Sequence, residues 1–260
     1  MTSLVLPYGP HWGPLGRMAD VSTVETSALV RLRVRVDEAV RRQTILVVTG
    51  RFGVGKSYAL ARAVEERAPV HGVEVVWLEM RDTRSEKDQW RELHKQIVGE
   101  YPAASASIGD IVRILKDVLA ERDRLLVLDE AQEVKPIVMK QLRWLHEPEA
   151  SKFGVVFSGT PTLWNDLLPG EVRSRTGHHV KVTGLGDDDA AALLPGFHPI
   201  FDDADEVDLR FWNQTRAKGS FRWWARVLAN AIDQLPHLPS GRLDRETIVP
   251  ITVDIPEGNR

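Results

Sequence analysis

Apolar residues gather in five short runs, each of which ends at a turn or at a polar residue. Within the runs the apolar side chains do not alternate with polar ones, which is typical of strands that are buried on both faces of a sheet. The five predicted strands span residues 44–49, 73–79, 125–129, 153–158 and 179–183.

The segments between these runs repeat their apolar residues with a helical period. Predicted helices span residues 22–42, 57–67, 86–99, 108–121 and 138–146. The first of them opens on Ser22-Thr23-Val24-Glu25, which has the spacing of a capping box. Strands and helices in alternation indicate βαβ units and an α/β fold with a parallel sheet covered on both faces.

The pattern changes after residue 185, where no further strand is predicted. Acidic stretches at 187–189 and 202–208 accompany predicted helices near 203–217 and 221–235. We therefore expect an irregular N-terminal arm (1–21), an α/β domain (22–185), a small helical domain (186–236) and a proline-rich, loosely held C-terminal tail (237–260).

The composition is that of an ordinary soluble protein, with a formal net charge of −3 over 260 residues. There are no cysteines, which excludes disulfides, thiol catalysis and cysteine-held metals. The N-terminus resembles no secretory signal, so we expect a cytoplasmic protein. The chain as a whole is not strongly basic, so any nucleic-acid contact would need a local patch or many subunits. Residues 186–260 are the most acidic part, with 8 basic and 13 acidic residues.

The segment between the first strand and the next helix reads GRFGVGKS, residues 50–57, and matches G-x-x-x-x-G-K-[ST] in full. Such a P-loop turns its backbone N–H groups toward phosphates at a helix N-terminus, and ATP is the expected ligand. Lys56 is expected to reach the β- and γ-phosphates, and the Ser57 hydroxyl to bind Mg²⁺. The predicted nucleotide-binding residues are Gly50, Gly53, Val54, Gly55, Lys56, Ser57 and Tyr58.

Two acidic residues end the third predicted strand, in the sequence LLVLDE at 125–130. Carboxylates at the C-terminal end of a strand lie at the edge where α/β sheets bind their ligands. Asp129 is suited to hold Mg²⁺, and Glu130 to orient and deprotonate an attacking water. The pair favours a hydrolase over a small-molecule kinase.

One class of P-loop ATPases inserts the strand that follows the acidic strand between it and the P-loop strand. Here that strand would be 153–158, and it ends in Ser158-Gly159-Thr160-Pro161. A hydroxyl at its end would lie beside the γ-phosphate and position the water. Thr160 is the first candidate for this role and Ser158 the second.

Taken together, the motifs resemble those of AAA+ ATPases, and among these the transposition regulators TnsC, TniB and MuB. The resemblance covers roughly residues 22–235, and ATPases of secretion systems share part of it. It rests on LLVLDEAQEV (125–134), QLRWLHE (141–147), FSGTPTLWNDLL (157–168), VRSR (172–175) and GSFRWWARVLANA (219–231). It implies the P-loop AAA+ fold, with a five-stranded parallel sheet between helices followed by a small helical lid domain.

The resemblance also implies roles for several cations. In that family an arginine reaches the γ-phosphate bound by a neighbouring subunit, and Arg175 is the first candidate here, with Arg173 second. The lid arginine that senses nucleotide would be Arg222. Arg81, Arg84 and Lys87 follow the second strand, where such ATPases project DNA-binding loops.

The function implied is an ATP-dependent regulator that forms a ring or helical filament on duplex DNA and recruits a transposase. ATP hydrolysis would then disassemble it. Whether a target-selection protein also takes part stays open. Two alternatives remain: an ATPase of a secretion or signalling system that does not bind DNA, and a nucleotide-gated, filament-forming adaptor with negligible turnover.

Overall fold

The computed structural model describes residues 21–80, 85–147, 152–234, 243–244 and 246–258. The described residues fall into two compact units. The first unit contains residues 28–49 and 57–181, and the second contains residues 21–27, 50–56 and those from 182 onward. Each unit is described below by itself.

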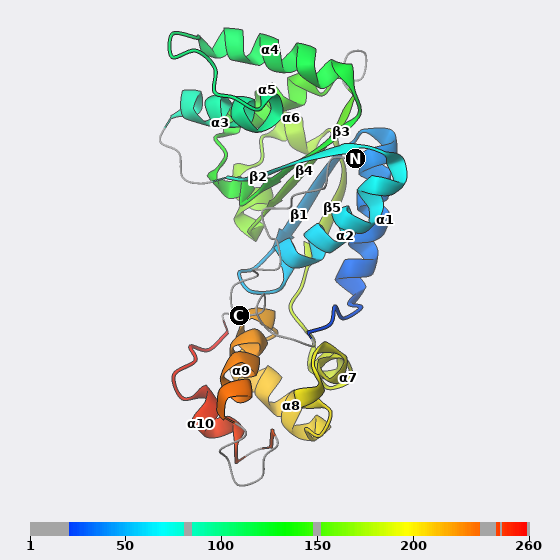
Figure 1. Cartoon of the computed structure of the whole chain (residues 1–260), viewed down its shortest axis with the longest axis vertical. Coiled ribbons are helices and arrows are strands. Elements are labelled where there is room, and N and C mark those ends of the chain that lie inside the picture. Colours follow the sequence, from blue (N-terminus) through cyan, green and yellow to red (C-terminus); the bar gives the residue numbers. More distant parts are fainter. Residues whose placement is uncertain (1–20, 81–84, 148–151, 235–242, 245, 259–260) are drawn as a thin grey trace. The chain divides into compact units, whose positions relative to one another are not determined.

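The first unit is built on a five-stranded sheet (Figure 1). Its strands are β1 (Ile45–Gly50), β2 (Glu74–Glu79), β3 (Arg124–Asp129), β4 (Phe153–Gly159) and β5 (Thr176–Val182). They lie in the order β2-β3-β4-β1-β5, and β2, β3, β4 and β1 pair in parallel. The predicted α/β fold is confirmed, and so is the insertion of β4 between β3 and β1. This order brings the C-terminal ends of the P-loop strand and the acidic strand to either side of the end of β4.

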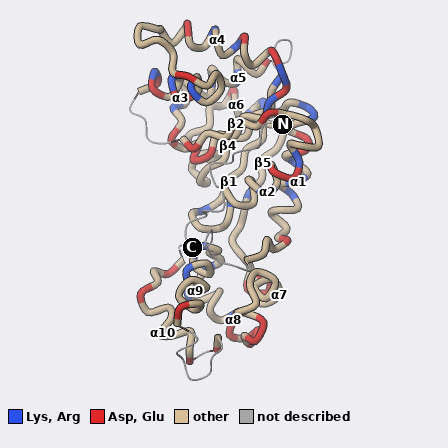
Figure 2. The backbone as a smooth tube through the Cα atoms, viewed as in Figure 1, with Lys and Arg blue, Asp and Glu red and all other residues tan. Residues whose placement is uncertain are grey.

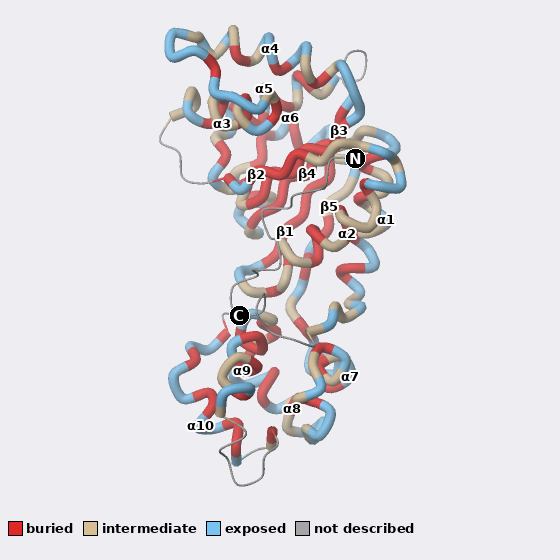
Figure 3. The backbone as a smooth tube through the Cα atoms, viewed as in Figure 1, coloured by how far each residue is buried: buried red, intermediate tan, exposed pale blue. Residues whose placement is uncertain are grey.

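Helices cover both faces of this sheet (Figure 1). On one face lie α1 (Ser27–Arg42) and α2 (Lys56–His71), and on the other α3 (Glu86–Val98), α4 (Ile108–Glu121) and α5 (Pro136–Leu145). Short helical segments follow β3 and β4, namely η2 (Ala131–Glu133), η3 (Leu163–Leu167) and α6 (Gly170–Arg173). Every residue of β1, β3 and β4 is buried, which explains the absence of alternation in their sequences (Figure 3).

The start of the first helix differs from the prediction by five residues. α1 begins at Ser27, and the capping box expected at Ser22 does not form. The Ser22 N–H instead donates to the carbonyl oxygen of Phe197 at 2.9 Å, within the second unit. A tertiary hydrogen bond therefore replaces the local cap.

The second unit is helical around an aromatic core. Its elements are α7 (Asp187–Phe197), η4 (Pro199–Phe201), α8 (Glu206–Trp212), η5 (Asn213–Ala217), α9 (Phe221–Gln234) and α10 (Ile248–Thr252). Phe201, Trp223 and Trp224 are almost fully enclosed there, and the two indole rings meet edge to face at 4.9 Å between centroids.

Two features of this unit depart from the sequence-based expectation. The first is α7, which was not predicted, because its sequence contains Pro195 and Gly196 and opens with three aspartates. The helix begins after Gly186, and the three aspartates lie in its first turn, where negative charge is favourable. The second is the C-terminal segment, which was expected to be loosely held. Its described part packs into the core through Leu243, Ile248, Ile251 and Ile255. Among the described residues, every helix is too short or too polar to span a lipid bilayer.

Candidate active site

The predicted phosphate loop joins β1 to α2, as a P-loop does. β1 ends at Gly50 and α2 begins at Lys56, which is 6% exposed. Gly53 and Gly55 have φ angles of +80° and +81°, a left-handed conformation that side chains rarely tolerate. A Cβ atom on Gly50 would lie 2.7 Å from the carbonyl oxygen of Val182. The geometry of the loop therefore requires all three glycines. A loop with left-handed residues at alternate positions turns its backbone N–H groups toward an anion.

Within the second unit, this loop is packed against the turn that precedes α9. The Gly53 carbonyl oxygen accepts hydrogen bonds from the Arg222 backbone N–H at 3.0 Å and from the Ser220 hydroxyl at 3.4 Å. A Cβ atom on Gly55 would lie 3.3 Å from the ring of Phe221. The exposed side chain of Arg222 thus projects from a helix whose backbone is bonded to the phosphate loop. Val54 is buried in the same loop.

The end of β3 carries the acidic pair in two different environments. Asp129 is fully buried, and its Oδ1 accepts hydrogen bonds from the Ser158 hydroxyl at 2.8 Å and from the Glu130 N–H at 3.0 Å. Glu130 is only half-buried, and its backbone is left-handed, with φ 52° and ψ 40°. A non-glycine residue in this conformation is uncommon and is often found at functional sites.

A glutamine that the sequence analysis did not single out joins the acidic residue to the end of β4. Gln132 Nε2 donates to Glu130 Oε2 at 2.6 Å, and Gln132 Oε1 accepts from the Thr160 N–H at 3.1 Å. The only sequence signal for this residue was its place in the DEAQ motif, two residues after Glu130.

The two hydroxyl candidates at the end of β4 lie in different places. Ser158 is fully buried and donates to Asp129. Thr160 is half-buried and directly follows β4. Ser57 and Tyr58 are both half-buried in the first turn of α2, next to Lys56 in the chain.

The two arginines that were candidates to reach the γ-phosphate bound by a neighbouring subunit also differ in their surroundings. Arg173 ends α6, and its guanidinium donates to the Trp164 carbonyl at 2.5 Å and lies 5.2 Å from the centre of the Trp164 ring. Arg175 is exposed, and among the described residues no ion pair is found for its side chain. Arg173 is therefore held within its own chain by Trp164, whereas the Arg175 side chain is accessible to another molecule.

A histidine on β5 adds a contact that the sequence did not indicate. The Thr49 hydroxyl and His179 Nε2 lie 2.8 Å apart, and the His179 ring stacks on Trp164 with centroids 4.0 Å apart. Burial lowers the pKa of His179, and the nearby charges of Lys181 and Arg173 lower it further. A neutral imidazole is therefore favoured beside Thr49, the residue before Gly50.

The predicted DNA contacts lie mostly where the structure gives no description. Arg81 and Arg84 are outside the described residues. Lys87 is half-buried in the first turn of α3, next to Glu86 and Asp88. On α1 the cations are largely neutralised, with Arg33 bound to Glu66 at 2.5 Å and Arg41 to Asp37 at 2.9 Å, so charges of both signs mix along this helix (Figure 2).

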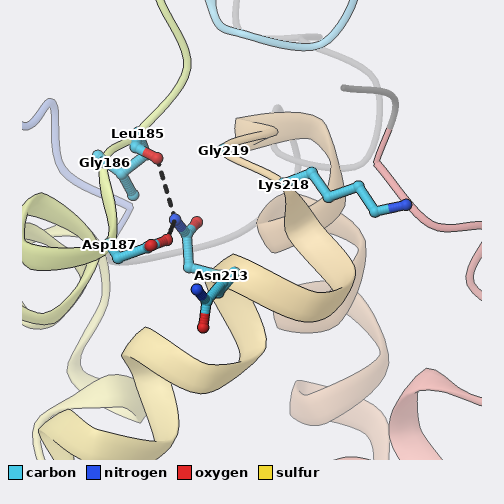
Figure 4. Close-up of a pocket in the computed structure, with 7 residues that line it drawn as sticks. Leu185, Gly186, Asp187, Asn213, Lys218 and Gly219 are labelled. Carbon is cyan, nitrogen blue, oxygen red and sulfur yellow. Dashed lines mark hydrogen bonds between the residues drawn. The ribbon is translucent and has the colours of Figure 1, made fainter.

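A separate pocket of about 280 Å³ lies in the second unit, between the start of α7 and η5. Figure 4 shows Asn213 pointing its amide toward Leu185 and Asp187. The amide nitrogen donates to the Leu185 carbonyl at 3.0 Å and to the Asp187 carboxylate at 2.8 Å. Its oxygen accepts from the Trp224 indole N–H at 3.1 Å. This wall of the pocket is thus fixed by one buried amide.

Comparison with solved structures finds related folds. Cdc6p of Pyrobaculum aerophilum superposes with a TM-score of 0.67 at 18% identity, over 85% of this chain and 65% of that one. Orc1 of Aeropyrum pernix, solved in complex with DNA, gives 0.65 at 18% identity, over 88% and 64%. RuvB of Thermotoga maritima, a Holliday junction branch migration motor, gives 0.58 at 14% identity, over 88% and 69%. This chain thus spans just under two thirds of Cdc6p and of Orc1.

The comparison with protein families agrees with this result. Residues 39–167 match the AAA domain family, and this range runs from the end of α1 to η3. A search of curated protein sequences gave no match. The five-stranded sheet with its flanking helices is therefore the P-loop AAA+ fold.

Proposed function

We propose that this protein is an ATPase of the AAA+ type. The observation that supports this best is the left-handed glycine loop between β1 and α2, combined with Asp129 and Glu130 at the end of β3. The loop would hold the phosphates through its N–H groups, and Lys56 would neutralise the β- and γ-phosphates. β1, which precedes the loop, and β3, which ends in the acidic pair, lie in the same sheet on either side of β4.

The residues at the sheet edge also fit Mg²⁺. Ser57 and Asp129 would hold it, because carboxylate and hydroxyl oxygens are the ligands that this hard cation prefers. Asp129 is fully buried with its Oδ1 fixed by two donors, so its carboxylate is oriented in advance. When bound, Mg²⁺ would neutralise charge on the β- and γ-phosphates.

The remaining residues would act on water and on the transferred phosphoryl group. Glu130, half-buried and close in sequence to Asp129, would orient the water and accept its proton. Thr160 rather than Ser158 would position the same water, because the Ser158 hydroxyl already donates to Asp129. The accessible Arg175 would neutralise charge on the γ-phosphate of a neighbouring subunit, and Arg222 would couple α9 to the nucleotide.

We further propose that the ATP-bound protein assembles on duplex DNA and regulates transposition by recruiting a transposase. The DEAQ, SGTPT, VRSR and GSFR motifs support this, as does the fold similarity to an Orc1 solved in complex with DNA. Arg81, Arg84 and Lys87 would supply the DNA contacts, with affinity built up by repetition along an oligomer. ATP hydrolysis would release the subunits.

The test compares Glu130→Gln, Lys56→Ala and the wild type. Glu130→Gln should bind ATP, lose about 10²-fold or more in turnover, and form persistent oligomers on DNA, whereas Lys56→Ala should fail to assemble. Steady-state ATP hydrolysis and electron microscopy with duplex DNA measure these effects. Wild-type turnover by Glu130→Gln would refute the assignment of the catalytic base.

DNA binding is tested separately, by filter binding across a salt series. The proposal requires ATP-dependent affinity that falls steeply with salt, because phosphate contacts release counterions. ATP hydrolysis without DNA affinity would instead support the ATPase of a secretion or signalling system. Oligomers with negligible turnover would support the nucleotide-gated adaptor.

A further inference from the structure

The segment between β3 and η3 holds a bridge of two hydrogen bonds centred on Gln132. Its amide nitrogen lies 2.6 Å from Glu130 Oε2, and its amide oxygen lies 3.1 Å from the Thr160 nitrogen. A carboxylate can only accept and a backbone N–H can only donate, so these two partners fix which end of the amide is which. The bridge therefore has one possible orientation.

The surroundings of Gln132 hold the bridge in place. Ala131, beside it in η2, is fully buried. Gly159 leaves room for the amide, because a Cβ atom there would lie 2.5 Å from Gln132 Oε1. The Glu130 carbonyl oxygen accepts from the Glu133 N–H at 2.9 Å, which holds the left-handed turn at Glu130. The backbone on both sides of the bridge is thus constrained.

We propose that Gln132 is a positioning residue for the ATPase reaction. It holds the Glu130 carboxylate at a fixed place relative to Thr160, so that base and water-positioning residue act as one unit. This inference rests on the proposed ATPase function. A glutamate side chain has three rotatable bonds, and a donor on one oxygen restricts them while the other oxygen stays available to water.

The test is Gln132→Leu, which is similar in size and removes both hydrogen bonds. Misplacing a catalytic group by about 1 Å can cost on the order of 10²-fold, so kcat should fall about 10- to 100-fold. ATP affinity, measured by titration of a fluorescent ATP analogue, should change less than about twofold, because the P-loop is untouched. Gln96→Leu, a matched exchange on the exposed side of α3, should leave kcat unchanged.

Two further variants separate positioning from folding. Gly159→Ala should reproduce the loss of kcat, because its Cβ displaces the amide of Gln132. In a Glu130→Gln background, Gln132→Leu should cause no further loss in single-turnover hydrolysis, because the group that it positions is already gone. Thermal denaturation of each variant reports whether the fold is retained.

Three results would overturn the inference. They are wild-type kcat in Gln132→Leu, a parallel loss of ATP affinity and thermal stability, and the same loss of rate in both backgrounds. If Glu130→Gln is inactive while Gln132→Leu turns over normally, only this inference fails. If the wild type does not hydrolyse ATP, the proposed function fails and this inference falls with it.

Discussion

Asn213 offers a direct test of what holds the second unit together. Its side chain is 1% exposed and makes three hydrogen bonds, to the Leu185 carbonyl, the Asp187 carboxylate and the Trp224 indole N–H (Figure 4). Asn213→Leu keeps the approximate volume and removes all three. The Trp224 side chain is fully buried, so its N–H would be left without a partner.

The expected cost follows from these three contacts. An unsatisfied buried donor costs about 1–3 kcal/mol, and the lost bond to Leu185 about 1 kcal/mol. Asp187 lies in the exposed first turn of α7, so water replaces its bond at little cost. The sum is about 2–4 kcal/mol, which raises the equilibrium constant for opening of α9 about 30- to 1,000-fold.

Hydrogen exchange of the α9 backbone amides measures this opening directly. Asn213→Leu should speed exchange within α9, and Asn165→Leu, at an exposed position in the first unit, should not. Trp224→Phe removes the donor, so Asn213→Leu should cost at least about 1 kcal/mol less in that background. An equal cost with and without the indole would refute the argument from the unsatisfied N–H.

Two more predictions concern the first unit. Hydrogen bonds from His71, and then from Arg67, hold the pKa of Asp37 well below its ordinary value, so the folded state gains stability above about pH 3.9 and loses it on acidification. Asp37→Asn should therefore lower the midpoint of urea unfolding at pH 7, and the midpoint of the variant should decrease less than that of the wild type between pH 7 and pH 3. Parallel pH profiles of the midpoint in the two proteins would contradict this. Arg175→Ala should retain ATP affinity but lose about 10³-fold in turnover, and mixing it with Glu130→Gln protein should restore part of that turnover. Arg173→Ala should lose far less, and an equal loss in both variants would remove the reason to prefer Arg175.

The three central strands of the sheet, β1, β3 and β4, could be predicted from the sequence because they are buried on both faces. The predicted strand at 125–129 is apolar up to its last residue, Asp129, and β3 occupies it with one added residue at its start. The start of a helix was harder to predict where it depends on a residue that is distant in the sequence. Ser22 forms its hydrogen bond with Phe197, 175 positions away, and no local pattern encodes that choice.

The residues of the candidate site also differ in whether the sequence could predict them. The glycines at 53 and 55 could be predicted because a loop of this shape requires left-handed backbone at fixed spacing. Gln132 could not, because its role depends on the left-handed turn at Glu130 and on side-chain hydrogen bonds to Glu130 and Thr160, which the spacing of the motif does not specify. The contact of His179 with Thr49 depends likewise on β5 pairing beside β1.

The hydrogen bond from the Arg222 N–H to the Gly53 carbonyl has a consequence for how this protein can be altered. It joins backbone to backbone, so replacing the side chain of Arg222 removes a charge but leaves the attachment of α9 to the loop intact. A proline at position 222 would remove the N–H and keep the helix start, since proline is tolerated in the first turn. Comparing alanine and proline at this one position would therefore separate the effect of the Arg222 charge from the effect of the backbone attachment of α9 to the loop.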